Sequence, residues 1–142
     1  TGQYASVGIL IANDVHTASG QKGLAVMTMV PKYGGFSIWR ADEDGDGETE
    51  KIFIGLPAGY GYYFRIIKKG RDFQAYFSQD GKTWVKDANV MHVEAANDIQ
   101  DVAAFTYANS VKDAMCKGVI SDFTVQPWTA ADEATMEGDI AK

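Results

Sequence analysis

An acidic stretch in the first half of the chain carries the residue types that bind a hard cation. Residues 42–50 have the sequence DEDGDGETE, with three aspartates at alternate positions followed by a glycine. This matches the first half of a calcium loop, in which oxygen ligands wrap the ion and glycine allows a sharp turn. Phe53 stands where that motif has its bidentate glutamate, so Glu48 or Glu50 would have to substitute. The predicted calcium ligands are Asp42, Asp44, Asp46 and Glu48. The alternative is a solvated hairpin loop that keeps a sheet edge charged.

A second candidate site lies on one face of two predicted strands, residues 62–68 and 73–78. Side chains alternate between the two faces of a strand. If the apolar side chains Phe64, Ile66, Phe73, Ala75 and Phe77 point to the core, then Arg65, Gln74, Tyr76 and Ser78 share the outer face. Sugar recognition uses flat rings that stack on C–H faces and planar polar groups that pair with hydroxyls. Ordinary packing of the same side chains is the alternative.

Trp39 and Arg40 belong to another predicted strand, residues 36–41. Adjacent residues on a strand face opposite ways, so only one of the two can join the cluster. The predicted ligand-binding residues are Trp39, Arg40, Arg65, Gln74 and Tyr76. Trp84 is expected in the core, because it follows a tight Asp-Gly turn and can fold over the end of a sandwich.

The chain lacks the residue patterns of a hydrolase, so we predict that it is not an enzyme. A retaining glycosidase needs two carboxyl groups about 5–5.5 Å apart, and no E-x-D-x-x-E string lies in a predicted strand. Glu94 falls in a polar stretch, and the two histidines, His16 and His92, lie in predicted loops. The single cysteine, Cys116, has no neighbouring base and is expected to be a packed thiol.

Strand signals dominate the chain that must position these residues. The 142 residues fit one domain, and about nine short apolar or alternating runs are separated by turn residues. The predicted strands are residues 4–11, 23–30, 36–41, 51–56, 62–68, 73–78, 83–86, 101–107 and 118–125. We therefore expect an all-β fold, an antiparallel two-sheet sandwich of jelly-roll type, over residues 1–127. Residues 128–142 form a C-terminal tail, either a short helix or a linker, because Thr129 and Asp132 have capping-box spacing.

The segment YYFRIIKKGRDFQAYFSQDGKTW, residues 62–84, resembles the concanavalin A-like lectin/glucanase superfamily. It is most similar to the regulation-of-enolase-like group of bacterial sandwich domains, which often accompany glycoside hydrolases. ASVGILI, GLAVMTMVPKYGGFSIWR and the closing ISDFTV extend the resemblance over residues 4–126. The resemblance implies a concanavalin A-like sandwich. It also implies further strands before the segment that begins here, missing or supplied by another segment. Where the family commonly has an arginine, this chain has Ala12.

The acidic net charge of the chain limits the classes of partner that it can bind. The net charge of −6 and pI of about 4.8 disfavour nucleic acid and anionic membrane, which both need a cationic face. We predict a secreted or cell-surface location. The leading hypothesis is a non-catalytic carbohydrate-binding or adhesion module that belongs, with other domains, to a larger secreted bacterial protein. The alternative is a structural or protein-interaction sandwich that acts as a spacer without a small ligand.

Overall fold

The computed structural model describes residues 4–16, 25–30, 36–41, 50–55, 63–109 and 118–140. These ranges contain eight strands and one helix. The elements are β1 (Tyr4–Ala12), β2 (Ala25–Val30), β3 (Phe36–Ala41), β4 (Glu50–Gly55), β5 (Tyr63–Lys69), β6 (Asp72–Ser78), β7 (Val85–His92), β8 (Asp101–Asn109) and α1 (Ala130–Asp139).

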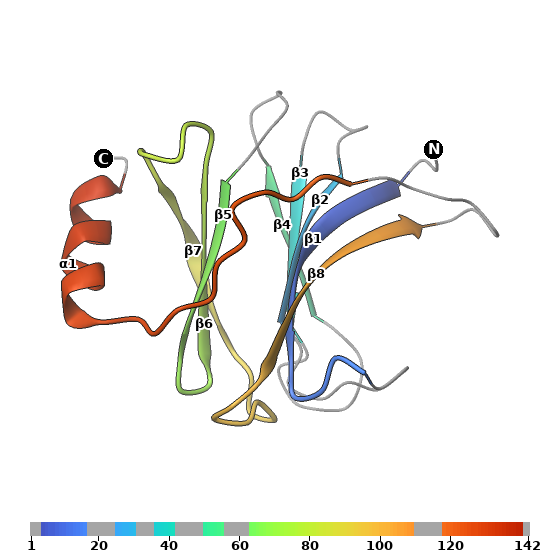
Figure 1. Cartoon of the computed structure of the whole chain (residues 1–142), viewed down its shortest axis with the longest axis horizontal. Coiled ribbons are helices and arrows are strands. Elements are labelled where there is room, and N and C mark those ends of the chain that lie inside the picture. The colour runs from blue at the N-terminus through green and yellow to red at the C-terminus, as the bar shows by residue number, and fades with distance from the viewer. Residues whose placement is uncertain are drawn as a thin grey trace.

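The strands form two antiparallel sheets, which confirms the predicted all-β fold class. One sheet has five strands in the order β4-β3-β2-β1-β8, and the other has three in the order β5-β6-β7. The sheets stack face to face, and α1 lies against the three-stranded sheet on the side away from the five-stranded one (Figure 1). The described chain therefore has three layers, of which the middle one carries the candidate site.

Two apolar clusters cover the two faces of the three-stranded sheet. The inter-sheet cluster contains Ile11, Phe73, Ala75, Phe77, Met91, Val93 and Ala96, with Phe64, Ile66 and Val102 packed against it. The outer cluster, under the helix, contains Ile67, Tyr76, Trp84 and Met136, with Trp128 and Ile140 packed against it. Alternation along β5 and β6 places these side chains as predicted. Trp84 is buried, also as predicted, but under the helix rather than between the sheets.

The turn after β6 holds Trp84 in place. The Asp80 carboxylate accepts hydrogen bonds from the backbone N–H groups of Lys82 (2.8 Å) and Thr83 (2.7 Å) and from the Ser78 hydroxyl (3.0 Å). The Ser78 hydroxyl oxygen in turn accepts from the N–H of Gly81 at 2.9 Å. Gly81 has a φ of +71°, a conformation that glycine adopts without steric cost. The Asp-Gly signal thus marks a closed polar turn that leads straight into Trp84.

One asparagine side chain fastens the end of β1 to the connection that links the two sheets. Asn13, just after β1, donates its amide to the carbonyl of Ala95 at 2.8 Å. Its side-chain oxygen accepts from the N–H of Asn97 and from the amide of Gln100, each at 2.8 Å. These bonds tie the end of β1 to the connection between β7 and β8, so they fix the sheets relative to one another at this end.

Residues 118–125 do not form the predicted ninth strand, so the proposed match of ISDFTV to a final strand is wrong. No described strand pairs with them, and Asp122 has a φ of 53°, which interrupts an extended run. Gly118 lies against Val7 and Thr106, so close that a Cβ there would come within 2.6 Å of the Thr106 methyl group. The segment instead leads to the outer face of the three-stranded sheet, where Trp128 packs.

One further boundary differs from that predicted, and the structure decides between the two alternatives for the C-terminal tail. The strand expected at residues 83–86 is β7, which continues to His92, because Met91 and Val93 alternate into the inter-sheet core. The C-terminal tail is a helix that returns to the sheet, not a linker. Thr129 caps it in a complete capping box with Asp132, and Ile140 forms a bridge with Trp84.

The turn predicts a pH dependence of stability. Hydrogen bonds from Thr83, Lys82 and Ser78 lower the pKa of Asp80 from 3.8 to about 2. Because the folded pKa is lowered, ionised Asp80 stabilises the fold above pH 3.8, and this contribution disappears as the pH falls towards about 2. Asp80→Asn should therefore lower the thermal unfolding midpoint at pH 5–7, and the difference from wild type should shrink towards pH 2. A difference that is constant over this range would contradict the assignment.

Candidate functional site

Three of the predicted ligand-binding residues share one face of the three-stranded sheet. Arg65 on β5 pairs in register with Tyr76 on β6, and Gln74 pairs with Ile67. All three lie opposite the residues that fill the inter-sheet core. The predicted division of faces is therefore correct, although the outer face does not open to solvent along its whole length.

The C-terminal segment covers one end of this face. The Arg65 guanidinium lies 4.3 Å from the centroid of the Trp84 ring and 5.6 Å from that of Trp128. It also donates to the sulfur of Met136 at 3.1 Å. Planar guanidinium groups stack on aromatic rings as well as they pair with polar ligands. In this chain Arg65 joins α1 and Trp128 to the sheet.

Trp39 and Arg40 lie on β3 of the five-stranded sheet, where they pair in register with Met27 and Val26 of β2. They therefore do not share a sheet with Arg65, and the expectation that one of them joins its face is wrong. The structure does not describe their side chains. The predicted calcium ligands Asp42, Asp44, Asp46 and Glu48 lie outside the described residues, so the calcium site stays a prediction.

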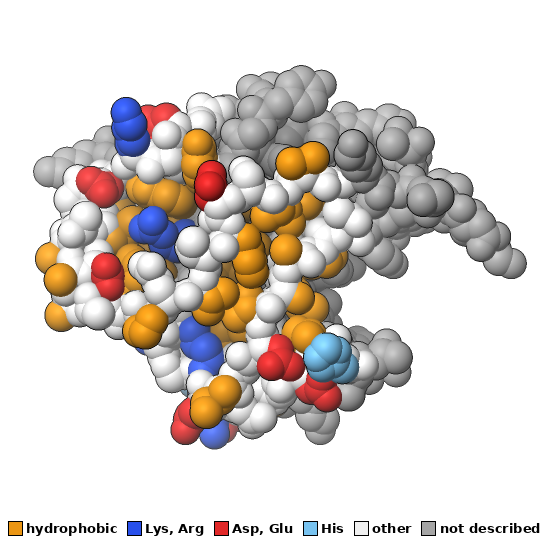
Figure 2. Space-filling view, viewed as in Figure 1, with side chains coloured by type: hydrophobic (Ala, Val, Ile, Leu, Met, Phe, Trp, Pro, Cys, Tyr) orange, Lys and Arg blue, Asp and Glu red, His pale blue; other side chains and the backbone are white. Residues whose placement is uncertain are grey.

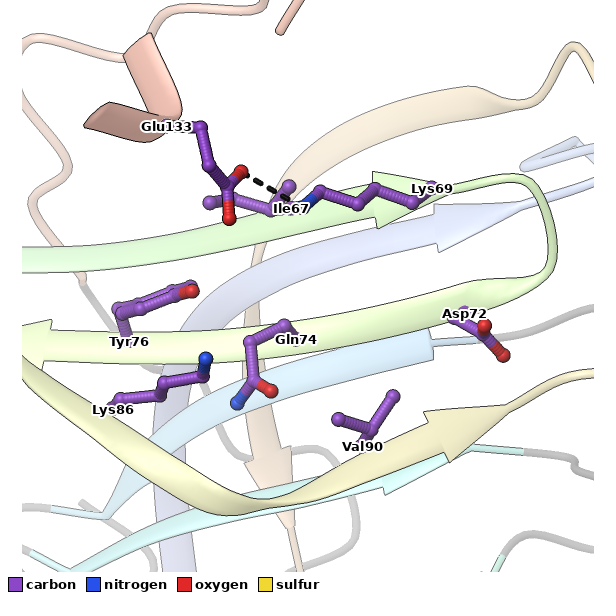
Figure 3. Close-up of a pocket in the computed structure, with 8 residues that line it drawn as sticks. All are labelled: Ile67, Lys69, Asp72, Gln74, Tyr76, Lys86, Val90 and Glu133. Atoms are coloured by element: carbon purple, nitrogen blue, oxygen red, sulfur yellow. Dashed lines mark ion pairs between the residues drawn. The ribbon is translucent and has the colours of Figure 1, made fainter. Parts of the chain in front are cut away.

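A pocket opens beside the helix on the same outer face. Its volume is about 210 Å³, smaller than the roughly 300–1,000 Å³ of pockets for drug-sized ligands. It is lined by Ile67, Lys69, Asp72, Gln74, Tyr76, Lys86, Val90 and Glu133 (Figure 3). Strands β5, β6 and β7 supply all of these except Glu133, which comes from α1. We call this space the outer-face pocket.

Gln74 and Tyr76 bring the two predicted polar groups into the outer-face pocket. Gln74 donates its amide to the carbonyl of Asp87 at 2.8 Å, which fixes the orientation of the side chain. Tyr76 is only 3% exposed. Its hydroxyl makes no hydrogen bond to another residue of the described ranges, and it points towards the middle of the pocket (Figure 3). Burial, with the charges of Glu133 and Glu137, raises the pKa of Tyr76, so the hydroxyl stays protonated at neutral pH.

The charges around the outer-face pocket are paired. Glu133 accepts from the Lys69 ammonium at 2.8 Å and from the indole N–H of Trp128 at 2.7 Å. Lys69 and Trp128 together hold the pKa of Glu133 below its ordinary value. Lys86 lies 3.9 Å from Glu137, also on α1. The two lysines beside the pocket are thus each balanced by a helix carboxylate.

A small ionic cluster borders the pocket at Asp72. The two ring nitrogens of His92 lie 2.6 Å from Asp72 and 3.0 Å from Glu94. Arg71 pairs with Glu94 at 2.5 Å. Hydrogen bonds to the two carboxylates, that to Asp72 foremost, raise the pKa of His92. All four side chains are exposed, and the cluster holds Asp72 at the edge of the pocket.

A larger cleft runs between the two sheets on the β5 and β8 side. It encloses about 690 Å³, and segment 122–128 forms one of its walls. Side chains of both sheets line it, among them Ile9, Phe64, Ile66 and Val102. Figure 2 shows hydrophobic side chains gathered in a band down the middle of this side of the molecule. Of the predicted site residues whose side chains the structure describes, Arg65 borders this cleft, whereas Gln74 and Tyr76 do not.

Six residues of the outer-face pocket were not predicted. Ile67, Lys69, Asp72, Lys86 and Val90 are cross-strand partners of one another or of Gln74 and Tyr76. The register set by the turns, combined with alternation, contains the signal for Ile67, Lys69, Asp72 and Lys86. Val90 lies beyond a register shift between Gln74 and Tyr76, which these signals do not contain. Glu133 carries no such signal, because its place depends on where α1 packs.

Comparison of the chain with protein-family models, with curated protein sequences and with solved structures found no match. Within the described ranges, no helix is both long and apolar enough to span a bilayer. No cluster of three or more His, Cys, Asp or Glu side chains suited to a metal ion occurs in that same part of the chain.

The stacked arginine predicts a specific loss of stability. Arg65→Ala removes both ring contacts and should lower the free energy of unfolding by about 1–2 kcal/mol, as expected for a partly desolvated cation–π interaction. Arg65→Lys keeps the positive charge but lacks the planar guanidinium group, so its loss of stability should be smaller than that of Arg65→Ala. Urea denaturation followed by tryptophan fluorescence measures both variants. Wild-type stability in Arg65→Ala would show that the stack is not stabilising.

Proposed function

We propose that this chain is a non-catalytic carbohydrate-binding module and that the outer-face pocket takes one ring of a neutral oligo- or polysaccharide. The observation that carries the proposal is the Tyr76 hydroxyl, which points into the pocket (Figure 3) from a side chain that is otherwise buried and makes no hydrogen bond to another described residue. A hydroxyl at the wall of a pocket can donate to and accept from a ligand hydroxyl that enters it.

The chemistry of the pocket suits a sugar ring. A sugar presents hydroxyl groups that both donate and accept at its edge, and C–H groups on its faces. The rim of the pocket offers the Tyr76 hydroxyl and the Asp72 carboxylate, and Ile67, Val90 and the stem of Gln74 supply apolar surface. The paired lysines leave no excess positive charge for an acidic ligand. A neutral sugar fits this balance best.

The same geometry supports the non-catalytic part of the proposal. A glycosidase acid needs a raised pKa so that it can hold its proton at neutral pH. Glu133, which lines the pocket, has a lowered pKa because Lys69 and Trp128 donate to its carboxylate. Asp72 is hydrogen-bonded to His92 on the far side. We propose that these carboxylates act by binding, in a secreted or cell-surface setting.

A second candidate is a protein-interaction sandwich, which one observation favours. Segment 118–125 exposes a row of large apolar side chains, with Val119 79%, Phe123 42% and Val125 67% exposed. Exposed apolar rows often mark contact surfaces. Light scattering coupled to size-exclusion chromatography would support this candidate by revealing a stable dimer.

Tyr76→Phe tests the carbohydrate proposal with little disturbance of the fold. The ring stays in the outer cluster, so stability should be unchanged. Loss of one hydrogen bond should weaken binding by about two- to tenfold. Affinity electrophoresis on β-glucan, xylan and galactomannan, with and without calcium, gives the measurement.

Tyr63→Phe is the matched control, because Tyr63 is 49% exposed and lines the inter-sheet cleft instead of the outer-face pocket. It should bind like wild type. Absence of retardation on every polysaccharide, in either ionic condition, would overturn the proposed function. Equal weakening in both variants would place the binding site elsewhere.

A further inference from the structure

The outer-face pocket is built partly from the sheet and partly from the helix. Glu133 of α1 lines it directly. Both lysines beside it, Lys69 and Lys86, are paired with helix glutamates at 2.8 and 3.9 Å. The pocket therefore has its complete set of polar groups only while α1 is docked.

The docking of α1 depends on few contacts. Met136 is its one buried residue within the described chain, and it inserts beside Ile67, Tyr76 and Trp84. The end of the helix is attached by the N–H of Trp84, which donates to the carbonyl of Asp139 at 2.9 Å. A helix of ten residues is not stable alone in water, where about 12–15 residues are the lower limit. Its helical form and its position on the sheet thus depend on each other.

We infer that occupation of the outer-face pocket and docking of α1 are thermodynamically coupled, so that the C-terminal helix senses the ligand. The inference rests on the proposed carbohydrate function. A sugar that contacts both the sheet and Glu133 binds the docked state more tightly than the undocked state. It must then shift the helix towards docking, and loss of docking must weaken the sugar by the same factor. In a larger protein, a segment joined to the end of α1 would be held closer to the sheet when the ligand is bound.

Met136→Ala is the variant that tests the coupling. It removes the buried contact of α1 and leaves the sheet side of the pocket intact. The probe is whichever of cellohexaose, xylohexaose and mannohexaose gives the tightest calorimetric isotherm with wild type. Met136→Ala should weaken its binding about tenfold or more, since the apparent affinity falls with the docked fraction. Adding Gly138→Ala, on the open side of the helix, should recover up to about fivefold by raising helix propensity.

Met91→Ala is the matched control. Met91 is 0% exposed and lies between the sheets, whereas Met136 is 2% exposed under the helix. The control loses a comparable buried side chain without touching α1, so its affinity for the hexasaccharide should stay at the wild-type value. An equal loss in both methionine variants would overturn the coupling, because it would reflect general destabilisation.

Hydrogen exchange on wild type gives a second readout that needs no variant. A saturating concentration of the hexasaccharide should slow exchange of the amides of residues 130–139. Binding without added protection there, or unchanged affinity in Met136→Ala, would overturn the coupling and leave the proposed function standing. Absence of binding of all three hexasaccharides to wild type would overturn both.

Discussion

The middle sheet of this protein has to be covered on both faces. Strand β6 places Phe73, Ala75 and Phe77 on one side, as an alternating strand should. The other side carries Ile67 and Tyr76, and Trp84 joins them after the turn. A sheet that is apolar on both faces needs two layers to bury it. The five-stranded sheet is one layer, and α1 with Trp128 is the other. The candidate pocket lies beside the region that this second layer covers.

Most of the sandwich was predictable because its signals are local. Seven of the predicted strands overlap β1 to β6 and β8, and an eighth overlaps the start of β7. Alternation and turn residues depend only on neighbours in sequence. The failure at residues 118–125 has the opposite origin. ISDFTV alternates as a strand would, yet Asp122 adopts a positive φ and no described partner strand is present. A strand needs a neighbour, and the sequence of one segment does not contain it.

The candidate site was predicted in its sheet half only. Gln74 and Tyr76 follow from alternation, and Lys86 follows from the register of the turn after β6. Val90 does not, because the pairing of β6 with β7 shifts in register between Gln74 and Tyr76. Glu133 could not be derived, because the packing of α1 is a long-range event. Arg65 shows a different difficulty. An outward arginine on a strand has the same sequence pattern whether its guanidinium stacks on tryptophan rings or is open to bind a sugar. In this chain Trp128, which is distant in sequence, packs over Arg65 and decides between the two.

Most of the Tyr76 side chain belongs to the outer apolar cluster, but its hydroxyl does not. A phenylalanine would fill the space beside Ile67, Trp84 and Met136 equally well. The hydroxyl lines the outer-face pocket and makes no hydrogen bond to another described residue. Packing therefore does not explain the oxygen atom. It lies at the border between the cluster and the pocket, where a ligand in the pocket can reach it. A tyrosine at this position is consistent with a role in which the ring holds the helix and the hydroxyl meets a ligand.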